Sequence, residues 1–160
     1  MSFYDAKNYS LERSIGFLVN TLAQEINEDL DVQLKAQLEV SLAQWRTLTA
    51  LHFNRSDTAA ALCGDLNYDS GAMTRMLDKL ETLGFVVRQA DADDRRAHKL
   101  TLTRAGAVIC KKGAILARDN LNVFMADLTD DEGEQLISLL QRLKHTRRQA
   151  KAIEKIKASR

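Results

Sequence analysis

The sequence predicts a mainly helical protein with one small β-hairpin between helices. Apolar residues recur every three or four positions along most of the 160 residues, which is the rhythm of amphipathic helices. The chain contains no proline, so nothing in its composition obliges a long helix to kink. Only residues 85–88 and 98–103 have the β-rich composition or the polar–apolar alternation of strands. A single hairpin flanked by helices on both sides is a restrictive pattern.

Two helices are expected before residue 53. The first runs from Ser10 to about Leu38, with its apolar face formed by Leu11, Ile15, Leu18, Leu22, Ile26 and Leu30. Ser41 followed three residues later by Gln44 is typical of a capping box, and it opens a second helix that continues to His52.

Two shorter helices and the hairpin follow. Thr58 is expected to cap a short helix, and Asp69 to cap the next one, whose inward residues are Met73, Met76, Leu77 and Leu80. Gly84 supplies a stop at the end of this helix. The strands at 85–88 and 98–103 then form an antiparallel hairpin with a long charged tip.

Helical rhythm returns after the hairpin. One long helix is expected from Thr103 to about Asp127. Thr129 and Glu132 form a second capping box, which opens a last helix with Leu136, Leu139, Leu140 and Leu143 on one face.

Composition favours a single cytoplasmic domain and excludes several other classes. Hydrophobic residues make up 45% and charged residues 28% of the chain, which is neither a disordered tail nor a membrane protein. The formal net charge of +1 does not by itself indicate a nucleic-acid or membrane partner. Two cysteines, Cys63 and Cys110, are too few for a secreted disulfide scaffold.

Residues 58–103 have the order of a winged helix-turn-helix: a short helix, a turn, a second helix and a hairpin. The second helix suits the DNA major groove, because its first turns expose Ser70, Thr74 and Arg75. An arginine can bind a guanine edge through two hydrogen bonds, and the hydroxyls can bind a base or a phosphate. Lys79 and Lys99 are further candidate DNA contacts.

The hairpin tip contains Asp93, Asp94, Arg95 and Arg96. This tip is poorly suited to general DNA binding, because together with Asp91 it holds three acidic and two basic side chains and its net charge is negative. The arrangement makes sense if Asp94 fixes one arginine by an ion pair while the other enters a narrow, A·T-rich minor groove. Which of the two arginines enters the groove stays open.

These residues resemble a known family. Asp94-x-Arg96, followed after five residues by Leu102-Thr103, resembles the wing signature of the MarR (multiple-antibiotic-resistance regulator) family. The helix-turn-helix of that family is similar to the run formed here by Thr58, Leu66, Asp69, Thr74, Arg75, Leu77, Asp78, Leu80, Glu81, Gly84 and Phe85.

The resemblance implies a homodimeric bacterial regulator and favours a repressor over an activator. It implies one domain over residues 1–160, with a DNA-binding lobe at 41–103 and dimerisation helices at 8–30 and 110–150. Such a dimer would bind pseudo-palindromic operators whose half-sites lie about 10 bp apart. A small aromatic or phenolic effector, held between the dimer region and a lobe, would release the DNA. Trp45, His52 and Phe17 are the candidate effector contacts, although core packing alone also explains the tryptophan.

Other functions have less support. A winged helix can also serve as a protein-interaction module, and Cys63 with Cys110 could make a redox-responsive regulator, although inert buried thiols are the simpler interpretation. His98 and His145 lack metal-ligand spacing, so neither a metal nor a cofactor is expected. Phosphate-loop and hydrolase motifs are absent from the sequence, which argues against an enzyme. The sequence does not identify the operator, the regulated genes or the effector.

Overall fold

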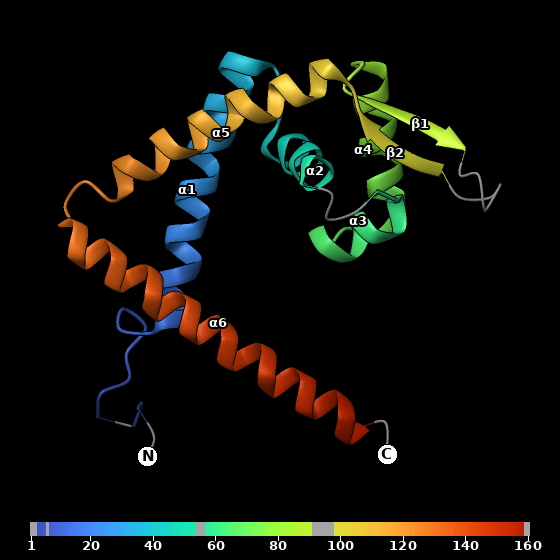
Figure 1. Cartoon of the computed structure of the whole chain (residues 1–160). Coiled ribbons are helices and arrows are strands. Elements are labelled where there is room, and N and C mark those ends of the chain that lie inside the picture. Colours follow the sequence, from blue (N-terminus) through green and yellow to red (C-terminus); the bar gives the residue numbers. More distant parts are fainter. Residues whose placement is uncertain (1–2, 6, 54–56, 91–97, 159–160) are drawn as a thin grey trace. The chain divides into compact units, whose positions relative to one another are not determined.

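The structure is a computed structural model that describes residues 3–5, 7–53, 57–90 and 98–158, with side chains except at 90, 98 and 147–158. Figure 1 shows the elements in chain order. They are α1 (Ile15–Leu38), α2 (Leu42–His52), α3 (Ala59–Leu66), α4 (Ser70–Thr82), β1 (Val86–Ala90), β2 (His98–Leu102), α5 (Arg104–Phe124) and α6 (Asp130–Ala158). The expected fold class, mainly helical with a small β wing, is confirmed.

The chain divides into two compact units, residues 1–120 and residues 121–160. The first unit holds α1 to β2 and most of α5. The second unit holds the end of α5 and α6. Within the described residues, none of the helices is both long enough and apolar enough to cross a lipid bilayer.

The start of α1 differs from the prediction. The helix begins at Ile15 rather than at Ser10. Tyr4 explains the difference, because its hydroxyl accepts a hydrogen bond from Ile15 N at 2.9 Å and donates one to Arg13 O at 3.1 Å. The amide of Ile15 therefore bonds to a side chain from outside the helix rather than to a carbonyl one turn earlier.

The junction between α1 and α2 follows the predicted chemistry. Glu39 ends α1 with a left-handed backbone, φ 57°. Ser41 and Gln44 form the expected capping box at the start of α2, with side chain to backbone bonds of 3.2 and 2.8 Å. Asp31 on α1 adds a second tie, because its carboxylate accepts a hydrogen bond from Leu42 N at 2.7 Å. This hydrogen bond lowers the pKa of Asp31, and the ion pair with Lys35 acts in the same direction.

The two strands form the expected antiparallel hairpin. Val86 pairs with Leu102 and Arg88 with Leu100. Leu100 N also donates to Asp57 O at 2.8 Å, so the segment before α3 joins the edge of the sheet.

One apolar core holds the first unit together around α4. Its members come from α2, α3, α4, both strands and α5, and include Leu48, Leu62, Met73, Leu77, Leu80, Val86, Leu100 and Cys110. Full burial of each such side chain contributes about 1.5–3 kcal/mol relative to exposure. A second cluster, formed by Leu30, Leu34, Val40 and Leu42, joins the end of α1 to α2. The position of α4 is therefore fixed by packing against its neighbours.

Helix α6, in the second unit, begins with the predicted capping box. Thr129 N donates to Glu132 Oε2 at 2.9 Å, and Glu132 N donates to Thr129 Oγ1 at 3.4 Å. The hydrogen bonds from the Thr129 amide and hydroxyl lower the pKa of Glu132. The leucines of α6 predicted to share one face are all exposed, at positions Leu136, Leu139, Leu140 and Leu143.

Candidate nucleic-acid interface

Helices α3 and α4 form a helix-turn-helix with a cap at each helix start. Thr58 Oγ1 accepts from Ala61 N at 3.3 Å, which caps α3. Asn67 ends α3 with φ 56°, a left-handed conformation that asparagine tolerates better than most residues. Asp69 then caps α4 by accepting from Ala72 N at 2.8 Å. Both predicted caps are confirmed, and together they define the turn between the helices.

Helix α4 separates an apolar face from a polar face. Met73, Leu77 and Leu80 are buried in the core. The predicted DNA-contacting residues on this helix, Ser70, Thr74, Arg75 and Lys79, are all exposed. A helix held rigidly on one side presents its polar side chains on the other side in a fixed register.

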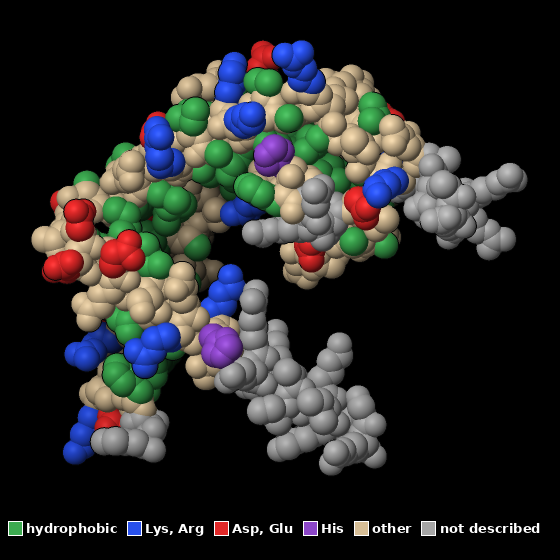
Figure 2. All heavy atoms as spheres, viewed as in Figure 1, with side chains coloured by type: hydrophobic (Ala, Val, Ile, Leu, Met, Phe, Trp, Pro, Cys, Tyr) green, Lys and Arg blue, Asp and Glu red, His purple; other side chains and the backbone are tan. Residues whose placement is uncertain are grey.

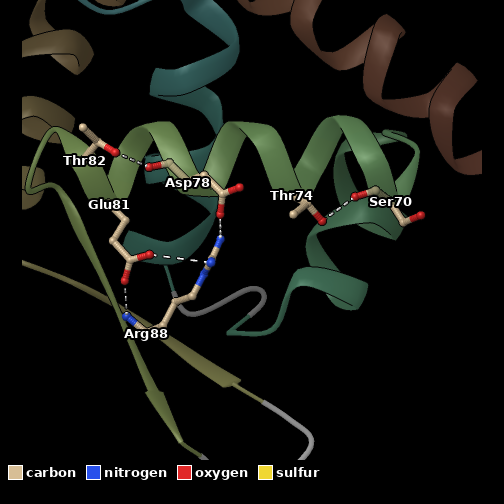
Figure 3. A network of polar contacts seen from close by, with 6 residues as sticks. All are labelled: Ser70, Thr74, Asp78, Glu81, Thr82 and Arg88. Carbon is tan, nitrogen blue, oxygen red and sulfur yellow. Dashed lines mark hydrogen bonds and ion pairs between the residues drawn. The ribbon is translucent and has the colours of Figure 1, made fainter.

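The first turns of α4 contain a glycine whose nearest neighbours are exposed side chains. Thr74 Oγ1 donates to Ser70 O at 2.8 Å, which uses the hydroxyl hydrogen but leaves the oxygen free to accept a bond (Figure 3). A β-carbon at Gly71 would lie 3.3 Å from Asp69 Oδ1 and 3.6 Å from Arg75 Nη1. The interior of the protein therefore does not require glycine at position 71, which is consistent with clearance for an external partner.

A cleft of about 480 Å³ opens beside α4, with cations on its wall. Arg75 and Lys79 come from α4, and Lys35 comes from the end of α1. The remaining lining residues are Glu39, Ser41, Gln44, Ala72 and Met76. The cleft thus joins the exposed polar side of α4 to the corner between α1 and α2.

Residues of the predicted wing are only partly described. Asp94, Arg95 and Arg96 lie outside the described residues. Lys99 stands on β2 and forms an ion pair with Asp57, with Nζ and Oδ2 3.3 Å apart.

A polar network around Arg88 connects β1 to α4 (Figure 3). Arg88 Nη2 contacts Asp78 Oδ1 at 2.5 Å, and Nη1 lies 3.6 Å from Glu81 Oε2. Arg88 is not among the site residues predicted from the sequence. The usable signal is the spacing of Asp78 and Glu81, two carboxylates three residues apart on a helix whose following strand carries an arginine.

The three candidate effector contacts have different surroundings in the described part of the chain. Trp45 lies against α5, with its Nε1 donating to Cys110 O at 3.3 Å. His52 is exposed at the end of α2, and Phe17 is exposed on α1. His52 lines a cleft of about 500 Å³ together with Leu51, Asp57, Lys99, Leu100, Thr101 and Leu102.

The two cysteines are free and lie in the apolar core region. Cys110 is buried and Cys63 is half-buried. Burial raises the pKa of the Cys110 thiol above its usual value. A raised pKa lowers the thiolate fraction, which is the reactive form. Among the described residues, no group of three or more histidine, cysteine or carboxylate side chains could hold a metal ion.

A capped helix pair with a hairpin behind it, and an exposed polar helix face, define a winged-helix transcriptional regulator. The MarR family model matches residues 40–98. The multiple antibiotic resistance protein MarR of Escherichia coli is 32% identical over 130 residues, covering 81% of this chain and 90% of that protein. The chain belongs to the MarR family.

Solved structures agree with this assignment. The crystal structure of a cysteine-to-serine mutant of E. coli MarR complexed with operator DNA has 30% identity and a TM-score of 0.71, covering 88% of this chain and 99% of that chain. The wild-type apo form of E. coli MarR gives a TM-score of 0.74 at 30% identity, with 81% and 96% covered. An S. aureus MepR–DNA complex shares the fold at 21% identity and a TM-score of 0.68, with 86% and 99% covered.

Proposed function

We propose that this MarR-family regulator binds operator DNA as a homodimer and represses transcription from the cytoplasm. The observation that carries the proposal is the construction of α4. Its start is capped by Asp69 and its inner face is packed in the core, while Ser70, Thr74 and Arg75 stay exposed. A relative at 30% identity was solved with operator DNA, which supports the same partner here.

In this proposal α4 enters the major groove, and its exposed polar side chains contact bases and phosphates. Arg75 binds a guanine edge through two hydrogen bonds. Ser70 and Thr74 bind a base or a phosphate oxygen. Lys79 and Lys99 contact phosphates, and Lys99 exchanges its ion pair with Asp57 for a DNA contact.

In the same proposal the wing binds the neighbouring minor groove. Arg95 or Arg96 enters the groove, and Asp94 holds the other guanidinium. A narrow A·T tract concentrates negative potential, so affinity is expected to rise with A·T content next to each half-site.

The homodimer is supported by exposed apolar side chains in each of the two units. On α1, the exposed Ile15, Leu18, Val19 and Leu22 have the spacing of one helix face. On α6, the exposed leucines repeat the same spacing. Figure 2 shows hydrophobic side chains exposed at the surface among charged and other polar ones. In this proposal residues 1–160 form one domain, and the helices at 8–30 and 110–150 bury such faces against a second copy of the chain. The resulting dimer would have the two-fold symmetry that a pseudo-palindromic operator needs.

Release by an effector is the regulatory part of the proposal. A small aromatic acid or phenol that binds only the DNA-incompetent spacing of the two lobes would shift the population away from DNA. The candidate contacts remain Trp45, His52 and Phe17. Of these, His52 already lines a cleft with a cation, Lys99, on its wall.

Binding to promoter DNA tests the proposal. The purified chain is titrated into labelled duplex fragments from the region upstream of its own gene and into shuffled duplexes of equal composition, and fluorescence anisotropy is recorded. Light scattering on the same sample measures the mass in solution. The proposal predicts a dimer that prefers at least one promoter fragment. A chain that binds all duplexes equally would instead fit a winged-helix module that recognises a protein.

A further inference from the structure

The outward side of α4 carries two carboxylates as well as two cations. Arg75, Asp78, Lys79 and Glu81 are all exposed, so their formal charges cancel, two against two. Asp78 follows Thr74 by about one helical turn on the same side of the helix (Figure 3). Duplex DNA carries one negative charge per ~1.7 Å of its axis, so an uncompensated carboxylate on this side opposes binding.

Arg88 compensates both carboxylates from a neighbouring element. Its guanidinium contacts Asp78 through Nη2 at 2.5 Å and reaches Glu81 through Nη1 at 3.6 Å. The backbone amide of Arg88 adds a bond to Glu81 Oε1 at 3.4 Å. The Arg88 side chain is 29% exposed, against 55% for Asp78 and 42% for Glu81, so the carboxylates partly cover the cation.

Because Arg88 lies on β1, its ion pairs with Asp78 and Glu81 also link this strand to α4. Arg88 lies in the middle of β1 and pairs with Leu100 on β2, so it belongs to the hairpin that carries the wing. One guanidinium therefore ties the wing strand to two successive turns of α4. Since exposed ion pairs contribute little to folding, typically about 0–1 kcal/mol, the main effect of this tie is not on overall stability.

We propose that Arg88 is a positioning residue for DNA recognition: it neutralises Asp78 and Glu81 on the DNA-facing side of α4. The inference rests on the proposed function, because it assigns a role within the same interface. Arg88 acts through the two carboxylates and needs no DNA contact of its own. A direct phosphate contact by Arg88 is the competing explanation, and it makes the opposite prediction when the carboxylates are removed.

Charge-matched variants separate the two explanations. The first is R88Q, which leaves both carboxylates uncompensated. The second combines R88Q with D78N and E81Q, which removes the carboxylates as well. The control combines R88Q with E25Q and D29N, since Glu25 and Asp29 are exposed on α1 and give the same net charge. Each variant is titrated into the preferred promoter duplex and into shuffled duplex, and its urea midpoint is measured in parallel.

R88Q is expected to weaken binding to the promoter duplex by roughly tenfold, with an almost unchanged urea midpoint. The D78N/E81Q combination is expected to restore the affinity, while the E25Q/D29N combination is not. The inference is overturned if R88Q binds like the wild type, if removing the carboxylates fails to restore binding, or if both combinations restore it equally. A wild-type chain without preference for any promoter duplex would instead refute the proposed function itself.

Discussion

Gly113 lies where α5 passes the indole ring of Trp45, and replacing it by alanine tests the packing between α2 and α5. Gly113 is buried, and a β-carbon built on it would overlap the Nε1, Cδ1 and Cε2 atoms of Trp45. The same Nε1 donates to Cys110 O at 3.3 Å. A methyl group fits here only if the indole moves away from α5.

The size of the effect follows from three contributions. Displacing the indole loses one hydrogen bond, worth about 1 kcal/mol. Overpacking a filled site costs about 1–3 kcal/mol. The better helix propensity of alanine offsets about 1 kcal/mol. We therefore expect Gly113→Ala to lower the free energy of unfolding by about 1–3 kcal/mol.

Urea unfolding followed by circular dichroism measures this loss, at one fixed chain concentration because the proposed dimerisation would shift apparent stability. Trp45 is the single tryptophan, so its fluorescence reports on the indole directly. Gly64 in α3 is the matched control, because a β-carbon there meets nothing within 4 Å. Gly64→Ala should leave stability equal or higher. An unchanged midpoint and emission maximum for Gly113→Ala would refute the contact between α5 and the indole.

Three further predictions concern α4, the α1–α2 junction and the thiols. Gly71→Ala should leave the free energy of unfolding within about 1 kcal/mol of the wild type but weaken operator binding, since the added methyl lies nearest to the exposed side chains of Asp69 and Arg75. Equal affinity on titration would contradict the clearance role. The lowered pKa of Asp31 contributes stability that is present above its unfolded value near 3.8 and is lost as pH falls through the folded value. Asp31→Asn should therefore cost about 1 kcal/mol at pH 7 in urea titrations, and this cost should shrink as the pH falls below 3.8, whereas a pH-independent difference would count against this linkage. Peroxide should leave operator binding unchanged, because Cys110 is buried with a raised pKa; release of DNA that a C63S/C110S variant abolishes would establish the redox alternative.

Local chemistry made much of the fold predictable. Ser41 with Gln44, Thr58, Asp69 and Thr129 each satisfy helix-end amides within three residues, so the sequence alone indicates where four helices begin. The inward and outward faces of α4 likewise follow from its spacing, since the helix repeats every 3.6 residues.

Long-range contacts were not predictable in the same way. The start of α1 depends on the hydroxyl of Tyr4, eleven residues from the amide that it accepts. The environment of Trp45 depends on Cys110, 65 residues away on α5. The tie between Arg88 and Asp78 depends on the path of β1 after the turn at Gly84, where φ is +71°. Each of these contacts requires the folded chain, because no local pattern specifies which elements meet.

Binding of the Arg75→Ala variant to its preferred promoter duplex tests most directly whether α4 reads DNA. Arg75 is exposed in the first turns of α4, so its removal should spare folding and the dimer mass by light scattering. We predict a loss of about 1–3 kcal/mol for the preferred duplex and a smaller loss for shuffled duplex. Equal affinity of the variant and the wild type for the preferred duplex would contradict the assignment of α4 as the helix that reads the major groove.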